Sequence, residues 1–198
     1  MTGHVFIDES KARGYLLAAA ALLPADLGHA RLVIRGLTLP GQQRLHMTKE
    51  SAPRRRSILS ALRGLDLTVT LYDAGCTHIH ELDARAGCLR QLVTDAAAAH
   101  ATLLVLEEDA SLRRWDNQQL IEITRDFGCH QTLRYEHRRA AVEPLLAVPD
   151  AIAWCWARGG DWRNRVRPLI DTVHRVDPSP GSAKPGSPTV RKAAGPTS

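Results

Sequence analysis

Hydrophobic positions divide the chain into short strands and helices. Two apolar runs, residues 5–7 and 15–23, are separated by a short polar segment, and so short a connection predicts an antiparallel strand pair. Residues 67–72 alternate between apolar and polar, which is typical of a half-buried strand. The continuous apolar run 102–106 predicts a central strand covered on both faces, and residues 131–135 predict one more strand.

Helical spacing fills the segments between these strands. The strongest pattern steps by three and four residues from Ile79 to Ala96, with Thr77 as its expected N-cap, and Ser51 is expected to cap a helix over residues 52–62. We also expect helices at residues 25–37, 115–127, 149–158 and 162–176. This alternation predicts a three-layer α/β domain, with a mixed central sheet of about five strands and helices on both faces.

The end of the chain differs from the rest in composition. From Asp177 onward it consists mainly of Pro, Gly, Ser, Ala and Lys, so we expect one domain over residues 1–176 and a disordered tail over residues 177–198. No apolar run approaches the ~20 residues that cross a membrane, and no basic segment precedes the first strand. The four cysteines are scattered without C-x-x-C spacing, which favours a reducing cytoplasm.

The charge balance permits an anionic partner without requiring one. The net charge is +5 and the isoelectric point is about 9.3, a mild basic bias that is compatible with nucleic-acid binding. Arg54, Arg55, Arg163 and Arg165 are the candidate phosphate contacts, although such arginines also occur on ordinary solvated faces. The pattern predicts no particular oligomeric state.

Three acids stand where the predicted fold could bring them together. Asp8 follows the first strand, Glu107 follows the run 102–106, and Asp150 lies in the first turn of an unusually apolar helix. If the two strands are parallel neighbours, Asp8 and Glu107 share one edge of the sheet. Three carboxylates share a site at neutral pH only with a proton or a cation, since two charges ~4 Å apart repel by about 4 kcal/mol at an effective dielectric of 20.

Such a cluster has both a catalytic interpretation and a purely structural one. Mg²⁺ or Mn²⁺ prefers carboxylate oxygens, and two such ions suit in-line phosphoryl transfer, as in many nucleases. Alternatively, Asp8 and Glu9 form a hairpin turn, Glu107 and Glu108 belong to a solvated strand-to-helix turn, and Asp150 complements a helix dipole. The side-chain alternation of a strand places Glu9 on the side opposite Asp8, so Glu9 is at most an auxiliary residue.

The same segments resemble a bacterial and phage family, the domain-of-unknown-function family three-thousand-eight-hundred. The segment Phe6–Ser10 is similar to the Tyr/Phe-Ile-Asp-Glu-Ser-Gly with which its members open, and Leu45–Met47 is similar to a Leu-His-Phe-like segment before a helix. Val105–Glu108 stands at the strand that ends in Asp-Glu, and Leu146–Ile152 stands at a Leu-Gln-Leu-Ala-Asp-Leu helix. The resemblance covers roughly residues 4–158 and implies a ribonuclease H-like fold.

The resemblance implies a divalent-metal-dependent nuclease, with Asp8, Glu107 and Asp150 as catalytic and metal-binding residues. His46, Glu50 and Glu108 are possible auxiliary residues. The chain departs from the family pattern, since Arg44 stands where many members have an acid and Glu107 is one methylene longer than the expected Asp. A non-catalytic relative that binds nucleic acid or protein therefore remains the alternative, and the family suggests a part in a mobile element or a defence system.

Overall fold

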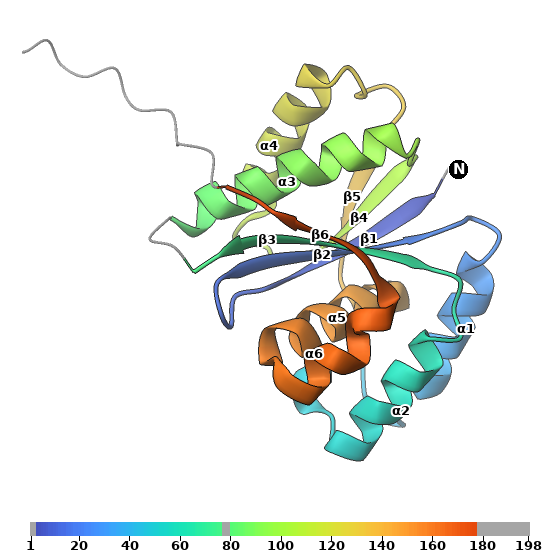
Figure 1. The fold of residues 1–198 in the computed structure, drawn as a ribbon. Coiled ribbons are helices and arrows are strands. Elements are labelled where there is room, and N and C mark those ends of the chain that lie inside the picture. The colour runs from blue at the N-terminus through green and yellow to red at the C-terminus, as the bar shows by residue number, and fades with distance from the viewer. Residues whose placement is uncertain (1–2, 77–79, 178–198) are drawn as a thin grey trace, which may run out of the picture.

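The computed structural model describes residues 3–76 and 80–177, which form a six-stranded sheet between two layers of helices (Figure 1). The chain begins with the hairpin of β1 (His4–Ser10) and β2 (Tyr15–Leu22), followed by α1 (Leu27–Leu37), α2 (Ala52–Leu62) and β3 (Thr68–Gly75). It continues with α3 (Glu81–Ala98), β4 (Leu103–Glu107), α4 (Arg113–Asp126) and β5 (Arg134–Arg138). It ends with α5 (Ala147–Arg158), α6 (Gly160–Val166) and β6 (Ile170–Arg175).

The sheet is mixed and has the order β5-β4-β1-β2-β3-β6. The pairs β1–β2 and β2–β3 are antiparallel, and the pairs β1–β4, β4–β5 and β3–β6 are parallel. Helices α1, α2, α5 and α6 cover one face of the sheet, and α3 and α4 cover the other (Figure 1). The predicted three-layer α/β architecture with helices on both faces is therefore confirmed.

Side chains of β1 and β2 alternate between two separate cores. Phe6 packs with the core under α1, α2 and α5, whereas Val5 and Ile7 pack with the core under α3 and α4. In β2 the run Ala18–Ala21 keeps both faces of the central strand small. This lets α5 pack closely across β1 and β2 on one side while α3 packs against β2 on the other.

Several predicted boundaries are confirmed. Ser51 caps α2, where its side chain accepts a hydrogen bond from the Arg54 amide, and α5 ends at Gly159, which has a positive φ of 74°. The predicted cap Thr77 and the residue Ile79 lie outside the described residues, as does the expected tail from residue 178 onward. No described helix is both long enough and apolar enough to span a bilayer.

Three predicted elements need correction. Residues 162–176 do not form one helix, because α6 ends at Val166 and a 3-10 turn with Pro168 follows. The next segment, in which three of six residues are β-branched, forms β6 beside β3 as a sixth strand. Strand β5 begins three residues later than predicted, at Arg134, where its pairing with β4 starts. Helix α5 begins at Ala147 rather than Pro149, directly after a short 3-10 turn.

Candidate functional site

Asp8 and Glu107 are neighbours at the carboxyl edge of two parallel strands. The register pairs Phe6 with Val105 and Ile7 with Leu106, so Asp8 and Glu107 are the next residues of the two strands. Strand β1 runs on to Ser10 and pairs with β2 throughout, so Asp8 and Glu9 lie in the strand and not in the hairpin turn. The alternation of side chains places Asp8 and Glu107 on the face that α5 covers.

Asp150 reaches the same face from the first turn of α5. Its Oδ2 accepts a hydrogen bond of 2.9 Å from the Met47 amide and lies 3.3 Å from Nδ1 of His46. Helix α5 packs across β1, which brings this carboxylate toward Asp8. His46 and Met47 therefore fix the orientation of Asp150 from the segment that precedes α2.

The three carboxylates influence one another electrostatically. The pKa of Asp8 is raised well above its ordinary value, first by burial, then by the negative charges of Glu107 and Asp150 and by a hydrogen bond to Glu107. The Glu9 amide donates a hydrogen bond of 2.7 Å to Oδ1 of Asp8, which holds the carboxyl group against the backbone. The predicted convergence of Asp8, Glu107 and Asp150 on one face is thus present.

Arg44 forms an ion pair with Glu107. Its Nη1 donates to Oε1 of Glu107, and both side chains are partly exposed, at 34% and 23% respectively. The nearby guanidinium also lowers the pKa of Asp8, against the larger effects of burial and of the two other acids. A positively charged group therefore already stands beside the carboxylate cluster, at the position where the sequence departs from the family pattern.

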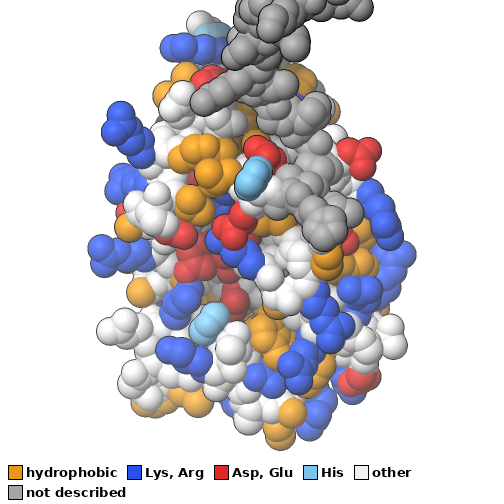
Figure 2. Space-filling view, turned by 90° about the vertical axis from the view of Figure 1, so that its left-hand side faces the viewer, with side chains coloured by type: hydrophobic (Ala, Val, Ile, Leu, Met, Phe, Trp, Pro, Cys, Tyr) orange, Lys and Arg blue, Asp and Glu red, His pale blue; other side chains and the backbone are white. Residues whose placement is uncertain are grey.

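A cavity of about 360 Å³ opens at this edge of the sheet. It is lined by Asp8, Glu9, Arg44, Arg85 and Glu107, among others. A second cavity of about 560 Å³ shares Arg44, Glu107 and Glu108 with the first and extends to His46, Lys49 and Arg139. Figure 2 looks onto this edge and shows acidic side chains near the middle of the face, with lysine and arginine side chains around them.

The carboxylate oxygens of the cluster are not arranged as the ligands of a bound metal ion would be. Within residues 3–76 and 80–177, no group of three or more His, Cys, Asp or Glu side chains is positioned as a ready-made metal site. Asp150 does not line the first cavity, and Glu107 is engaged by Arg44. A cation at Glu107 would have to compete with this guanidinium.

Glu9 belongs to a buried network on the opposite face of the sheet. It accepts hydrogen bonds from Tyr15 and Arg85, and Arg85 also binds both oxygens of Asp116 at 2.6 and 2.7 Å. His137 lies 3.3 Å from Asp116, and the side chains of Arg85 and Asp116 are almost entirely buried. Burial alone would raise the pKa of Asp116, but its hydrogen bonds with His137 and Arg85 hold it below the ordinary value.

Sequence reasoning missed this network, although a signal for it exists. Arg85 lies on the same helical stripe as the buried residues Cys88, Leu89 and Leu92, and a charge inside an apolar stripe indicates a buried partner. The opposite orientation of Glu9 relative to Asp8 is as predicted. Both side chains nevertheless line the first cavity, because it opens at the edge of the sheet between the two faces.

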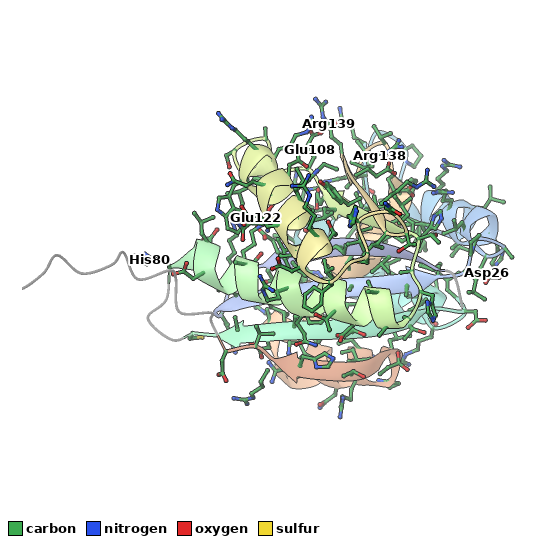
Figure 3. All side chains as sticks on the ribbon, turned by 90° about the horizontal axis from the view of Figure 1, so that it is seen from above. Asp26, His80, Glu108, Glu122, Arg138 and Arg139 are labelled. Carbon is green, nitrogen blue, oxygen red and sulfur yellow. The ribbon has the colours of Figure 1, made fainter. Side chains whose placement is uncertain are left out.

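The other predicted auxiliary acids lie beside arginines. Glu50 is buried and binds Gln42 at 3.0 Å and Arg54 at 3.3 Å. Glu108 lies beside Arg139 (Figure 3), with the ion-pair atoms 3.5 Å apart, and it also binds Arg113 at 3.0 Å. Glu108 borders both cavities, whereas Glu50 lines neither.

The four predicted phosphate contacts all have partners within the protein. Arg54 binds Glu50 and the Leu37 carbonyl oxygen. Arg55 donates to the Met47 and Thr48 carbonyl oxygens, Arg163 donates to that of Trp156, and Arg165 binds Asp161. Their role in nucleic-acid binding stays a prediction.

No model of a known protein family matches this chain, and no curated protein sequence is significantly similar to it.

Proposed function

We propose that this protein is a divalent-metal-dependent phosphodiesterase of nuclease type that acts on nucleic acid. The observation that carries the proposal is the convergence of Asp8, Glu107 and Asp150 on one face of the sheet, where the two other acids raise the pKa of Asp8. A structural turn or a helix cap does not require three carboxylates that repel one another. Such repulsion is removed when a proton or a cation binds.

The sheet topology supports the same proposal. Three antiparallel strands, β1 to β3, are extended by β4 and β5, which run parallel to β1, and this order is compatible with the ribonuclease H-like fold that the sequence resemblance implies. Membership of the family that the motifs resemble is part of this proposal. So are a nucleic-acid partner and a cytoplasmic location.

The donor chemistry fits Mg²⁺ or Mn²⁺. Both are hard cations that take oxygen ligands, and Asp8, Glu107 and Asp150 would supply carboxylate oxygens. A divalent cation bound there would activate a water molecule and offset the charge of the phosphate during in-line displacement.

The residues around the acids would prepare the site for this chemistry. Met47 and His46 orient Asp150, and the Glu9 amide holds Asp8. Arg44 is partly exposed at the junction of the two cavities, so its guanidinium is positioned to exchange Glu107 for a phosphate oxygen of the substrate. Lys49 and Arg139 border the second cavity and would attract the flanking phosphates.

The Arg44–Glu107 ion pair also favours a second function. A guanidinium that stays on Glu107 neutralises the cluster without a metal, and the domain would then bind nucleic acid or protein without cleaving it. This alternative predicts salt-sensitive binding of nucleic acid and no turnover.

A cleavage assay separates these two functions. Purified protein is incubated with labelled single-stranded and duplex DNA and RNA, in Mg²⁺, in Mn²⁺ or in EDTA. We expect cleavage only with the divalent cations, and we expect Asp8→Asn to abolish it while Glu122→Gln, on the exposed surface of α4, retains it. Cleavage that persists in Asp8→Asn contradicts the proposed site, and binding without cleavage under every condition favours the non-catalytic alternative.

A further inference from the structure

Positive charge is concentrated on one side of the molecule. Residues 49–63 and 158–167 carry nine Lys and Arg side chains against two acids, although the whole chain has a net charge of only +5. These residues form α2, α6 and their flanks in a single helical layer, and Arg63 joins the two helices through a 2.6 Å hydrogen bond to the Arg165 carbonyl oxygen. The lower right of Figure 2 shows lysine and arginine side chains interleaved with hydrophobic ones in this layer.

Tryptophan and arginine side chains stack on one another within this basic layer. The guanidinium of Arg55 lies 4.3 Å from the ring centre of Trp154 and 6.0 Å from that of Trp162, and Arg165 lies 5.9 Å from the Trp162 ring. The two tryptophan rings meet edge to face, with their centres 5.6 Å apart. We call Arg55, Trp154, Trp162 and Arg165 the arginine–tryptophan ladder.

The ladder is held rigid by contacts with the protein. Arg55 donates to the Met47 and Thr48 carbonyl oxygens, and Arg165 binds Asp161 at 2.7 Å. All four ladder side chains are half-buried, so each keeps part of its surface exposed to solvent. Indole rings and guanidinium planes that are held in place in this way are well suited to stack on nucleic-acid bases.

A single residue, Met47, connects the ladder to the carboxylate cluster. Met47 donates its amide hydrogen to Asp150, and its carbonyl oxygen accepts a 2.8 Å hydrogen bond from Arg55. Trp154 lies on α5 four residues after Asp150, which places both on the same side of that helix. A nucleic-acid strand whose bases stack on the ladder would therefore pass directly beside Asp150.

We propose that the arginine–tryptophan ladder binds single-stranded nucleic acid and leads the strand into the carboxylate cluster. Bases stack on the ladder, while the exposed side chains of Arg56, Arg158 and Arg167 contact phosphates. In a duplex the bases are stacked on one another and cannot stack on the ladder. The proposal therefore predicts that the protein binds a single strand more tightly than a duplex. The inference deepens the proposed function and rests on it for the fate of the bound strand.

Binding is measured by fluorescence anisotropy with a labelled 12-nucleotide single strand and the matching duplex, both in EDTA so that no metal-dependent cleavage interferes. We expect tighter binding of the single strand, together with quenching of intrinsic tryptophan fluorescence. Trp162→Leu should weaken single-strand binding by at least about fivefold, and Trp162→Phe should restore most of it. Arg167→Gln should reduce the salt dependence by about 0.7 in the slope of log K against log salt concentration.

A control variant and a set of contrary outcomes keep the inference testable. Arg125→Gln removes the same charge from the exposed surface of α4, in the opposite helical layer, and should bind like the wild type. Three outcomes would overturn the proposal. They are equal affinity for duplex and single strand, a loss of affinity in Arg125→Gln equal to that in Arg167→Gln, and binding only to anionic phosphatidylglycerol vesicles. Single-strand binding that persists without cleavage after Mn²⁺ is added would instead refute the hydrolase and leave the ladder in place.

Discussion

Asp8 and Glu107 follow the last paired residues of two parallel strands and share the face beneath α5. A folded protein gains no stability from two acids in such a position. The raised pKa of Asp8 shows that its ionised form is unfavourable in the folded protein, first because of burial and then because of the charges of Glu107 and Asp150. Such a loss of stability is common at active sites, which is why the proposed function accounts for the cluster.

Asp8→Asn should therefore stabilise the fold at neutral pH in the absence of divalent cations. The folded-state pKa of Asp8 lies above the unfolded value of about 3.9, so its stabilising effect is fully present below pH ~4 and is lost as the pH rises through the folded pKa. Asparagine stays neutral, so the advantage of the variant should grow from pH 4 upward, by about 1.4 kcal/mol for each unit of pKa difference. Thermal melts at several pH values in EDTA measure it as a rise in Tm of roughly 2–4 °C per kcal/mol.

Divalent cation provides the control for this measurement. Mn²⁺ should raise the Tm of the wild type and leave that of Asp8→Asn nearly unchanged, because only the wild type offers the full carboxylate set. A variant that is less stable than the wild type at pH 7 would contradict the assigned electrostatics of Asp8.

Arg44→Ala should tighten Mn²⁺ binding. The guanidinium engages Glu107 and would repel a cation at the cluster, so its removal should lower the Kd for Mn²⁺ by about tenfold, which corresponds to about 1.4 kcal/mol. Titration calorimetry measures this affinity directly. Arg138→Ala is the matched control, because Arg138 stands beside Glu107 in the register of β4 and β5 but binds Glu136. An unchanged or weaker affinity in Arg44→Ala would show that Arg44 does not compete with the cation, and the absence of any Mn²⁺ binding would refute the metal site itself.

The layered architecture could be predicted because hydrophobic periodicity reports directly which positions are buried. The alternation in β3 and the stripe along α3 each marked one element correctly. Strand β6 was missed because it is an edge strand whose exposed positions are polar, so its only apolar signal is the pair Ile170 and Val173. The start of β5 was misplaced for a related reason, since pairing with β4 sets its boundary and no local pattern does.

The acids of the candidate site could be predicted because each stands where an apolar run of the sequence ends or begins. Their contacts could not. The ion pair of Arg44 with Glu107 spans 63 positions, and the link of Met47 to Asp150 spans 103. Such distant pairings depend on how the segment before α2 lies against β4 and α5, and the local hydrophobic pattern does not report that geometry.

Arg85→Met should destabilise the protein severely. The substitution leaves Asp116 fully buried without its bidentate partner, and breaking a buried ion pair on one side costs about 3–5 kcal/mol. The matched control is Arg90→Met, which removes the exposed Arg90–Asp126 pair between the same two helices and should cost no more than about 1 kcal/mol. Urea unfolding measures the free energy of unfolding of both variants. Equal losses would show that the Arg85 network does not stabilise the packing of α3 against α4 more than the exposed pair does.

Gly14→Ala should destabilise the β1–β2 hairpin. Gly14 has a φ of 97°, in the left-handed region that residues with a Cβ rarely adopt, and a Cβ there would collide with the carbonyl group of Gly75. Strain and collision together should lower the free energy of unfolding by about 1–3 kcal/mol. Gly28→Ala is the opposite control, because this glycine lies in α1 with open space around its Cβ position, and alanine should stabilise the helix by roughly 0.5–1 kcal/mol. Urea unfolding of the two variants should thus move the midpoint in opposite directions, and a neutral Gly14→Ala would show that the hairpin can shift away from Gly75.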